Sequence, residues 1–381
     1  MPSRVDAIHS YYLSLFELLI FIAFVIVLKI VMLILMAKLS VILSDDPQAA
    51  REQRDERKRR SSFDQTSAQK WLRLGLGLLF TASGLLQIQP RMVSISEQAL
   101  NQDFHFTLGP TAIESLAASF GRLWVNHSTW MNVLSCGLQL LIGLLLLTTS
   151  HRLAVIITAS IAAVMGLLDF VIMTGFGGLF SAGGSLLGST PVRGLVYFAV
   201  SVLCLIPVRY WREGKPFRFI RFGIVAFWIL GIILQLLPGE GYWQSVGWTR
   251  MLQSGTSSTE PRFIQGMTSA VAKFVAPHAA VLNIAVIILM VLFALSVVFV
   301  KWSYSRAIQL ASIVYLVLTW AVFEHLGFQT VYLFPMDAGT AVILALLMVQ
   351  NGQQEQRKVK TAGQESKLHS KPAVPSSRSS R

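Results

Sequence analysis

Residues 73–90 read RLGLGLLFTASGLLQIQP, and residues 221–238 read RFGIVAFWILGIILQLLP. Both stretches begin with arginine, continue with apolar and small residues, and end in Gln-x-x-Pro. At an offset of 148 residues (221 minus 73), the matching residues are Arg73, Gly75, Gln87 and Pro90 with Arg221, Gly223, Gln235 and Pro238. A shared polar frame around a helix-length apolar run predicts that the chain repeats one membrane-spanning unit.

A second match extends the repeat toward the C-terminus of each unit. His127 and Asn132 match His278 and Asn283 at an offset of 151 residues (278 minus 127), and both pairs read His-x4-Asn at the start of a long apolar block. Six matched residues in the same order are hard to attribute to hydrophobic bias, so we predict a duplication. Each copy holds four apolar blocks, and an even number predicts parallel copies related by an axis along the membrane normal.

The composition places the chain in the membrane class. It is 54% hydrophobic and 13% charged, whereas soluble proteins carry roughly twice that charged fraction. The apolar residues form blocks near the roughly 20 residues that a membrane-spanning helix needs. We predict an all-α polytopic membrane protein with about nine transmembrane helices, an N-terminal helix plus two parallel four-helix repeats. The expected blocks are 11–43, 72–89, 130–149, 153–173, 192–208, 221–238, 279–300, 307–325 and 337–349.

These blocks divide the chain into five regions. The first apolar block is too long for the core of a cleavable signal peptide, so we expect it to remain as a helix. The regions are an N-terminal transmembrane helix (1–44), a cytoplasmic charged linker (45–70), a first four-helix repeat (71–210), a second four-helix repeat (211–350) and a disordered basic cytoplasmic tail (351–381).

The basic residues predict the orientation. With the 45–70 linker inside, 22 of the 32 Lys and Arg fall in cytoplasmic segments, seven in exterior segments and three inside helices. The positive-inside rule then favours a multi-pass protein of the cell membrane with its N-terminus outside and its C-terminus in the cytoplasm. Because the net charge of +13 comes from short loops, it indicates contact with anionic lipid of the bilayer and argues against a nucleic-acid partner.

The first apolar helix carries a family resemblance. Its pattern Arg73-x3-Gly77-x2-Phe80-x3-Gly84 resembles the DoxX-like four-helix membrane proteins. The second copy departs from this pattern, because it keeps arginine at position 221 but has Val225, Trp228 and Ile232 at the other places. The resemblance implies a redox-associated, quinone-linked membrane subunit that works with a membrane or redox partner subunit.

A closer resemblance is to bacterial tandem-repeat polytopic membrane proteins of unassigned activity. They have a similar Gly-Leu-Leu-Gln-x-Gln-Pro helix, a His-x4-Asn helix start and a Leu-Leu-Pro-Gly turn like residues 236–239. This resemblance covers roughly residues 70–350 and implies fold and kinship. It leaves open which cofactor the chain binds and whether the chain is an enzyme.

Buried polar residues of membrane helices face protein and either pair or serve function. Ser128, Asn132, Ser135 and Gln139 are spaced by four, three and four residues, which puts them on one face of a helix. The second copy has Met290 where the first has Gln139. Of the two copies, the first is therefore the better candidate for a polar pocket. The candidate polar and ionisable site residues are His127, Asn132, Gln139, His278, Asn283, Glu324, His325 and Asp337.

The histidines and acids leave two interpretations open. His127 and His278 could carry protons or bind a ligand, or they could anchor helix starts at the interface while the following asparagines bond neighbouring helices. No further ligand stands at helical spacing from either histidine, so we predict no metal site. Glu324, His325 and Asp337 form the densest ionisable group, and Asp169 could pair with Arg73 only if their depths match.

Three functions remain as alternatives. The first is the quinone-linked redox subunit that the DoxX-like resemblance implies. The second is a protein that transports or binds a small solute or ion through the polar pocket of the first repeat. The third is a membrane scaffold without a small-molecule site.

Overall fold

The computed structural model describes residues 9–20, 23, 31, 65–88, 111–149, 151–173, 193–237, 241–253, 262–299 and 302–323. Within these ranges the regular elements are all helices, so the all-α prediction is confirmed for the described chain. Four helical stretches are long and apolar enough to cross a membrane: 128–148, 152–171, 215–236 and 262–298. Shorter apolar helices occupy 194–205 and 310–323.

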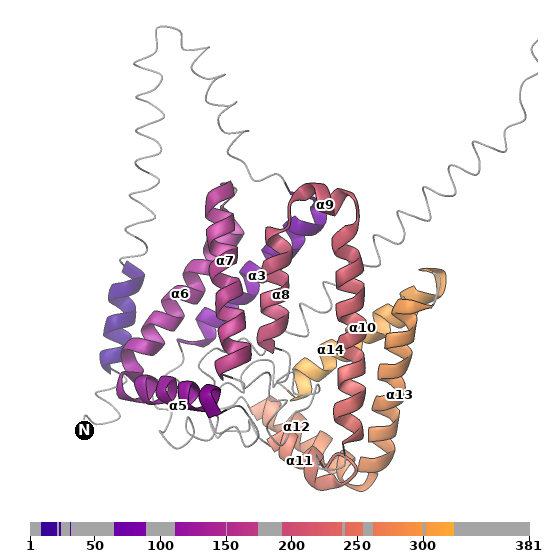
Figure 1. Cartoon of the computed structure of the whole chain (residues 1–381). Coiled ribbons are helices and arrows are strands. Elements are labelled where there is room, and N and C mark those ends of the chain that lie inside the picture. The colour runs from indigo at the N-terminus through magenta and orange to yellow at the C-terminus, as the bar shows by residue number, and fades with distance from the viewer. Residues whose placement is uncertain are drawn as a thin grey trace, which may run out of the picture.

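Figure 1 shows how the described helices are arranged in space. The first part of the described chain contains α3 (Ser67–Leu86), α5 (Thr111–Asn126), α6 (Ser128–Thr148), α7 (Arg152–Leu168) with its π-helical extension η2 (Asp169–Met173), and α8 (Arg193–Leu205). The second contains α9 (Val208–Arg212), α10 (Lys215–Leu236), α11 (Ser245–Gln253), α12 (Arg262–Val275), the 3-10 turn η5 (Ala276–His278), α13 (Ala279–Val298) and α14 (Trp302–Phe323).

Seven of the predicted apolar blocks correspond to helices α3, α6, α7 with η2, α8, α10, α13 and α14, and their ends differ by six residues or fewer. The first block is helical where it is described, over residues 9–20. The last block, 337–349, lies outside the described residues.

Helix α3 begins inside the stretch expected as linker. The Oγ of Thr66 accepts a hydrogen bond from the backbone N–H of Gln69 at 3.3 Å, and the side chain of Gln69 accepts one from the backbone N–H of Thr66 at 3.2 Å. This capping box satisfies two backbone donors and starts the helix at Ser67. The Nε2 of Gln69 also donates to the carbonyl of Ile206 at 2.7 Å, which joins the start of α3 to the end of α8.

Helices α3 and α6 pack antiparallel through small residues. A Cβ added at Gly84 would lie 2.8 Å from the side chain of Leu140, and one added at Gly143 would lie 2.6 Å from the backbone nitrogen of Thr81. Membrane helices use such residues to bring their backbones together, because lipid provides no hydrophobic drive for their association. The glycines of the Arg73-to-Gly84 pattern therefore have a packing role.

Helices α7 and α8 make an equally close contact. A Cβ at Gly166 would lie 2.6 Å from the backbone nitrogen of Phe198, and Gly194 lies against the backbone of Phe170. One continuous apolar core runs from Leu72 of α3 through α7, α8, α10 and α13 to Leu316 of α14. The helices of both parts of the described chain therefore share a core.

Three helices occupy stretches that the sequence indicated as exterior loops. In Figure 1, α5 lies across the ends of α6 and α7, and α11 and α12 lie near the ends of α10 and α13. Trp124 anchors α5 with 2% of its surface exposed, and Ile264 anchors α12 with none exposed. Such amphipathic helices have moderate mean hydropathy, so a search for long apolar blocks does not detect them.

The close contact of α7 and α8 predicts a stability difference between two glycine substitutions. We expect Gly166→Ala to lower the free energy of unfolding by about 1–3 kcal/mol, because its Cβ meets backbone that cannot move aside. Gly223→Ala in α10 is the matched control, because a Cβ there has no atom within 4 Å. Thermal unfolding in detergent measures both, and equal melting temperatures would contradict the packing.

Candidate functional site

The predicted polar stripe of α6 lies against two polar side chains of α3. Ser83 and Gln87 of α3 and Asn132, Ser135 and Gln139 of α6 are all buried, with 5% or less of each residue exposed. We refer to these five residues as the polar seam. It follows the line along which the glycines of α3 and α6 bring the two helices together.

One end of the polar seam is centred on Gln139. The Oγ of Ser83 donates to the Oε1 of Gln139 across the helix interface. The Nε2 of Gln139 donates to the Oγ of Ser135, one turn earlier on α6, at 2.8 Å. Both ends of the Gln139 amide therefore have partners inside the protein.

The other end is centred on Gln87 and Asn132. The Nε2 of Gln87 donates to the Oδ1 of Asn132 at 2.7 Å, and the Nδ2 of Asn132 donates to the carbonyl of Ser128 at 2.7 Å. The hydroxyl of Tyr11 donates to the carbonyl of Gln87 at 2.7 Å, and Tyr11 has none of its surface exposed. The N-terminal helix is thereby attached to the polar seam.

Comparable residues of α10 and α13 make comparable contacts. The Nδ2 of Asn283 donates to the carbonyl of Gln235 at 3.1 Å. The position that corresponds to Gln139 holds Met290, which is 1% exposed. The second pair of helices therefore keeps a buried asparagine and glutamine that contact each other, and it has an apolar residue at the position of Gln139.

An arginine in the second turn of α3, and another in the second turn of α10, bonds the C-terminal end of the helix paired with it. The guanidinium of Arg73 donates to the carbonyl of Thr149, directly after α6. The Nε of Arg221 donates to the carbonyl of Val297 in the last turn of α13 at 2.7 Å. Each arginine meets carbonyls that the helix itself leaves without intrahelical partners.

Arg73 and Asp169 do not share a depth. Arg73 bonds Thr149, three residues before the start of α7, whereas Asp169 follows the last residue of that helix. A helix of 17 residues spans roughly 25 Å. The condition for the pairing that the sequence left open is therefore not met.

His127 and His278 occupy two separate helix junctions. His127 joins α5 to α6 and His278 joins η5 to α13, and both side chains are exposed. The ring of His278 stacks on Phe274 at 5.4 Å between centroids, and its Nδ1 lies 3.0 Å from the carbonyl of Phe274. The contacts of His278 suit the anchoring interpretation for that residue.

The remaining candidates, Glu324, His325 and Asp337, lie outside the described residues. Among the described residues, no group of three His, Cys, Asp or Glu side chains could hold a metal ion.

The sequence did not single out Tyr11 or Ser83, although both take part in this site. Ser83 and Gln87 are four residues apart on α3, the spacing of one helix face, and this signal could have paired them with the stripe of α6. Tyr11 has no such signal, because its partner Gln87 is 76 residues away in the sequence.

Chemically, the polar seam consists of amides and hydroxyls. These groups neither gain nor lose a proton near neutral pH, so they can donate and accept hydrogen bonds but cannot act as general acids or bases there. Comparison of the chain with known protein families, with curated proteins and with solved structures finds no match.

The polar seam predicts a stability cost for Asn132→Ala. This change leaves the Nε2 of Gln87 without its acceptor inside the protein, and we expect it to lower the free energy of unfolding by about 1–2 kcal/mol. Asn126→Ala is the matched control, because Asn126 ends α5 and is exposed. Denaturation in detergent measures both variants, and an equal effect would contradict the role of the contact.

Proposed function

We propose that the chain is a membrane scaffold built from two parallel four-helix units, in which the buried polar residues hold helices together. The observation that carries this proposal is the pairing within the polar seam. Both ends of the Gln139 amide and both ends of the Asn132 amide bond other groups of the protein. A solute entering along this seam would have to break those bonds without help from water.

The duplication within this proposal is supported by two pairs of contacts. Arg73 and Arg221 each bond a carbonyl at the end of a paired helix. Asn132 and Asn283 each bond the glutamine at the end of the preceding long helix, through its side chain in one case and its carbonyl in the other. The residues that match in sequence therefore also match in the partners that they bind.

The orientation with the N-terminus outside and the C-terminus in the cytoplasm is supported by the charges at the two ends of the bundle. Eight described basic side chains lie at the α9 end: Lys70, Arg73, Arg152, Arg209, Arg212, Lys215, Arg218 and Arg221. Three lie at the end formed by α5 and α12: Arg122, Arg262 and Lys273. The positive-inside rule assigns the α9 end to the cytoplasm.

A scaffold tolerates apolar replacement of a complete hydrogen-bonded group, whereas a binding site does not. We expect Gln139→Leu alone to lower the melting temperature, because Ser83 and Ser135 lose their partner. Adding Ser83→Ala and Ser135→Ala is expected to restore most of the loss, because the three side chains that bonded one another are then all apolar. Thermal unfolding in detergent measures the recovery.

The same variants test the transport alternative. For a scaffold, liposomes that contain the wild-type chain swell in glycerol no faster than empty liposomes. Swelling that requires the wild-type chain and is lost in Gln139→Leu, while the chain remains folded, would overturn the scaffold proposal in favour of transport.

A second candidate is the quinone-linked subunit, and a cluster of aromatic rings favours it. Trp228 of α10, Phe293 of α13 and Tyr315 of α14 pack with ring centroids 5.0–6.0 Å apart. Within the described part of the chain, the Nε1 of Trp228 and the hydroxyl of Tyr315 are buried without a hydrogen-bond partner. Two such donors beside aromatic rings suit a flat ligand with carbonyl oxygens, as in a quinone.

Extraction separates this candidate from the scaffold. If the aromatic cluster binds quinone, organic extraction of the purified chain yields quinone in proportion to protein, and Trp228→Phe together with Tyr315→Phe lowers the yield severalfold. Ser83→Ala is the matched control, because Ser83 lies in the polar seam of the other helix pair. Equal, trace yields from all variants would reject the quinone candidate.

A further inference from the structure

The chain makes a tight, positively charged turn between α8 and α10. We call residues 208–218 the basic corner. Gly214 adopts a left-handed conformation with φ of 76°, which lets the chain reverse from α9 into α10. Trp211 is 3% exposed and packs edge-on against Phe217, with ring centroids 5.4 Å apart. The corner is therefore held in a defined shape.

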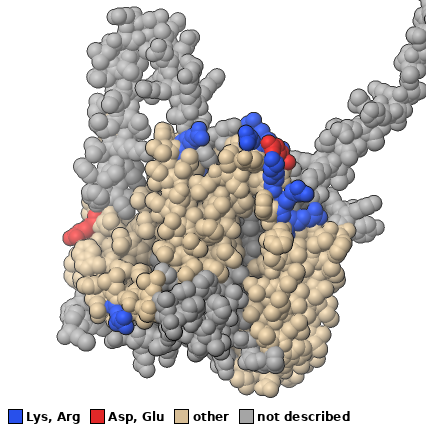
Figure 2. All heavy atoms as spheres, viewed as in Figure 1, with Lys and Arg blue, Asp and Glu red and all other residues tan. Residues whose placement is uncertain are grey.

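The basic corner carries an excess of positive charge. Arg209, Arg212, Lys215 and Arg218 are exposed, and Glu213 is the acid among them, so the corner carries a net charge of +3 (four minus one). Figure 2 shows blue side chains gathered at this end of the molecule, above a surface that is mostly uncharged. A phosphate group would be attracted to this position.

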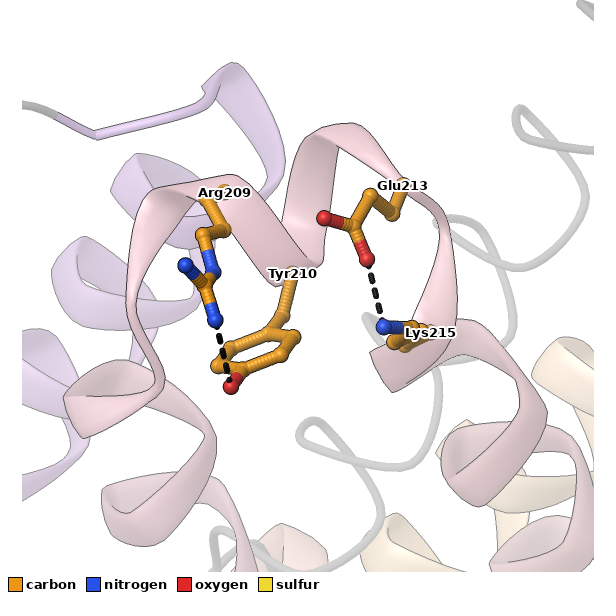
Figure 3. A network of polar contacts seen from close by, with 4 residues as sticks. All are labelled: Arg209, Tyr210, Glu213 and Lys215. Carbon is orange, nitrogen blue, oxygen red and sulfur yellow. Dashed lines mark hydrogen bonds and ion pairs between the residues drawn. The ribbon is translucent and has the colours of Figure 1, made fainter.

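Tyr210 and Glu213 hold two of these cations in place (Figure 3). The guanidinium of Arg209 donates to the hydroxyl of Tyr210 at 3.1 Å, and the Nζ of Lys215 lies 5.0 Å from the centre of the same ring. Lys215 also pairs with Glu213 at 2.6 Å. This hydrogen bond lowers the pKa of Glu213, so the carboxylate stays ionised at neutral pH.

One exposed face of α10 begins at Lys215 and continues with apolar residues. We call this row of residues the apolar line. Its residues are spaced by four, three, four, three and four positions, which places them on one helix face. They are Lys215, Phe219, Phe222, Ala226, Ile229 and Ile233, all exposed. Phe219 is 72% exposed and Phe222 is 74% exposed, and the space beside Gly223 is open.

The length of this line fits one lipid chain. Phe222 and Ile233 are eleven residues apart, which corresponds to roughly 16 Å of helix. Half of the hydrocarbon core of a bilayer is about 15 Å thick. A soluble phosphate would use only the charged end, whereas a phospholipid uses the charged end and the apolar line together.

We propose that the basic corner and the outer face of α10 form a binding site for one anionic phospholipid. Lys215 and Arg218 hold its phosphate, and an acyl chain lies along the face from Phe222 to Ile233. The site requires that α10 spans the membrane, but it does not depend on the scaffold function.

Native mass spectrometry tests this site on the full chain in detergent mixed with phosphatidylglycerol and phosphatidylcholine. We expect the wild-type chain to retain phosphatidylglycerol preferentially. Arg218→Gln is expected to weaken that retention about fivefold, the effect of one surface charge on an anionic lipid. Arg122→Gln is the matched control, because Arg122 is exposed at the opposite end of the bundle, and retention should remain unchanged.

A variant that binds phosphatidylglycerol more tightly completes the test, because a misfolded protein would lose binding and would not gain it. Glu213→Gln removes the acid that pairs with Lys215 and is expected to strengthen retention of phosphatidylglycerol about fivefold. Equal retention of the two lipids, or an equal loss in Arg122→Gln, would overturn the proposal. Displacement of the lipid by excess inorganic phosphate would also overturn it, because the site would then recognise phosphate alone.

Discussion

The bilayer interior offers no water to bond a polar side chain, and this constraint governs how the helices of this protein meet. Gln87, Asn132 and Gln139 have none of their surface exposed. Burying an amide without hydrogen-bond partners costs free energy. A helix with a buried amide must therefore pack against a helix that offers a hydrogen-bond partner at the same depth. The hydrogen bond between Gln87 and Asn132 therefore fixes the pairing of α3 with α6 more narrowly than contacts between leucines could.

The same constraint is met with different chemistry in the second pair of long helices. Asn283 bonds the carbonyl of Gln235, and Trp228 and Phe293 belong to the apolar core between these helices. Aromatic rings fill much of this space by area and shape, and they leave the Nε1 of Trp228 and the hydroxyl of Tyr315 buried without a hydrogen-bond partner among the described residues. The arginine and asparagine contacts lie toward opposite ends of the paired helices and fix their alignment. The side chains between these two contacts can therefore differ from one helix pair to the other.

Hydropathy and periodicity predicted the parts of this fold that depend on single segments. Helices α6, α10 and α13 are long and apolar, and the spacing of Ser128, Asn132, Ser135 and Gln139 placed these residues on one face. The partners Ser83 and Tyr11 depend on how two helices are aligned in space, which local spacing does not specify. The amphipathic α5 and α12 were missed because their mean hydropathy is moderate, and Glu324, His325 and Asp337 lie outside the described residues.

The inward and outward faces of α10 therefore differ in which substitutions they tolerate. The inward face holds Trp228 and Gln235, and a change there must suit the core or the paired helix. The outward face holds Phe219 and Phe222, where lipid accepts many apolar shapes, so its residues can vary without disturbing the fold. The basic corner lies at the N-terminal end of this outward face, and its basic side chains are exposed. The proposed lipid site is therefore separate from the contacts that hold the bundle together.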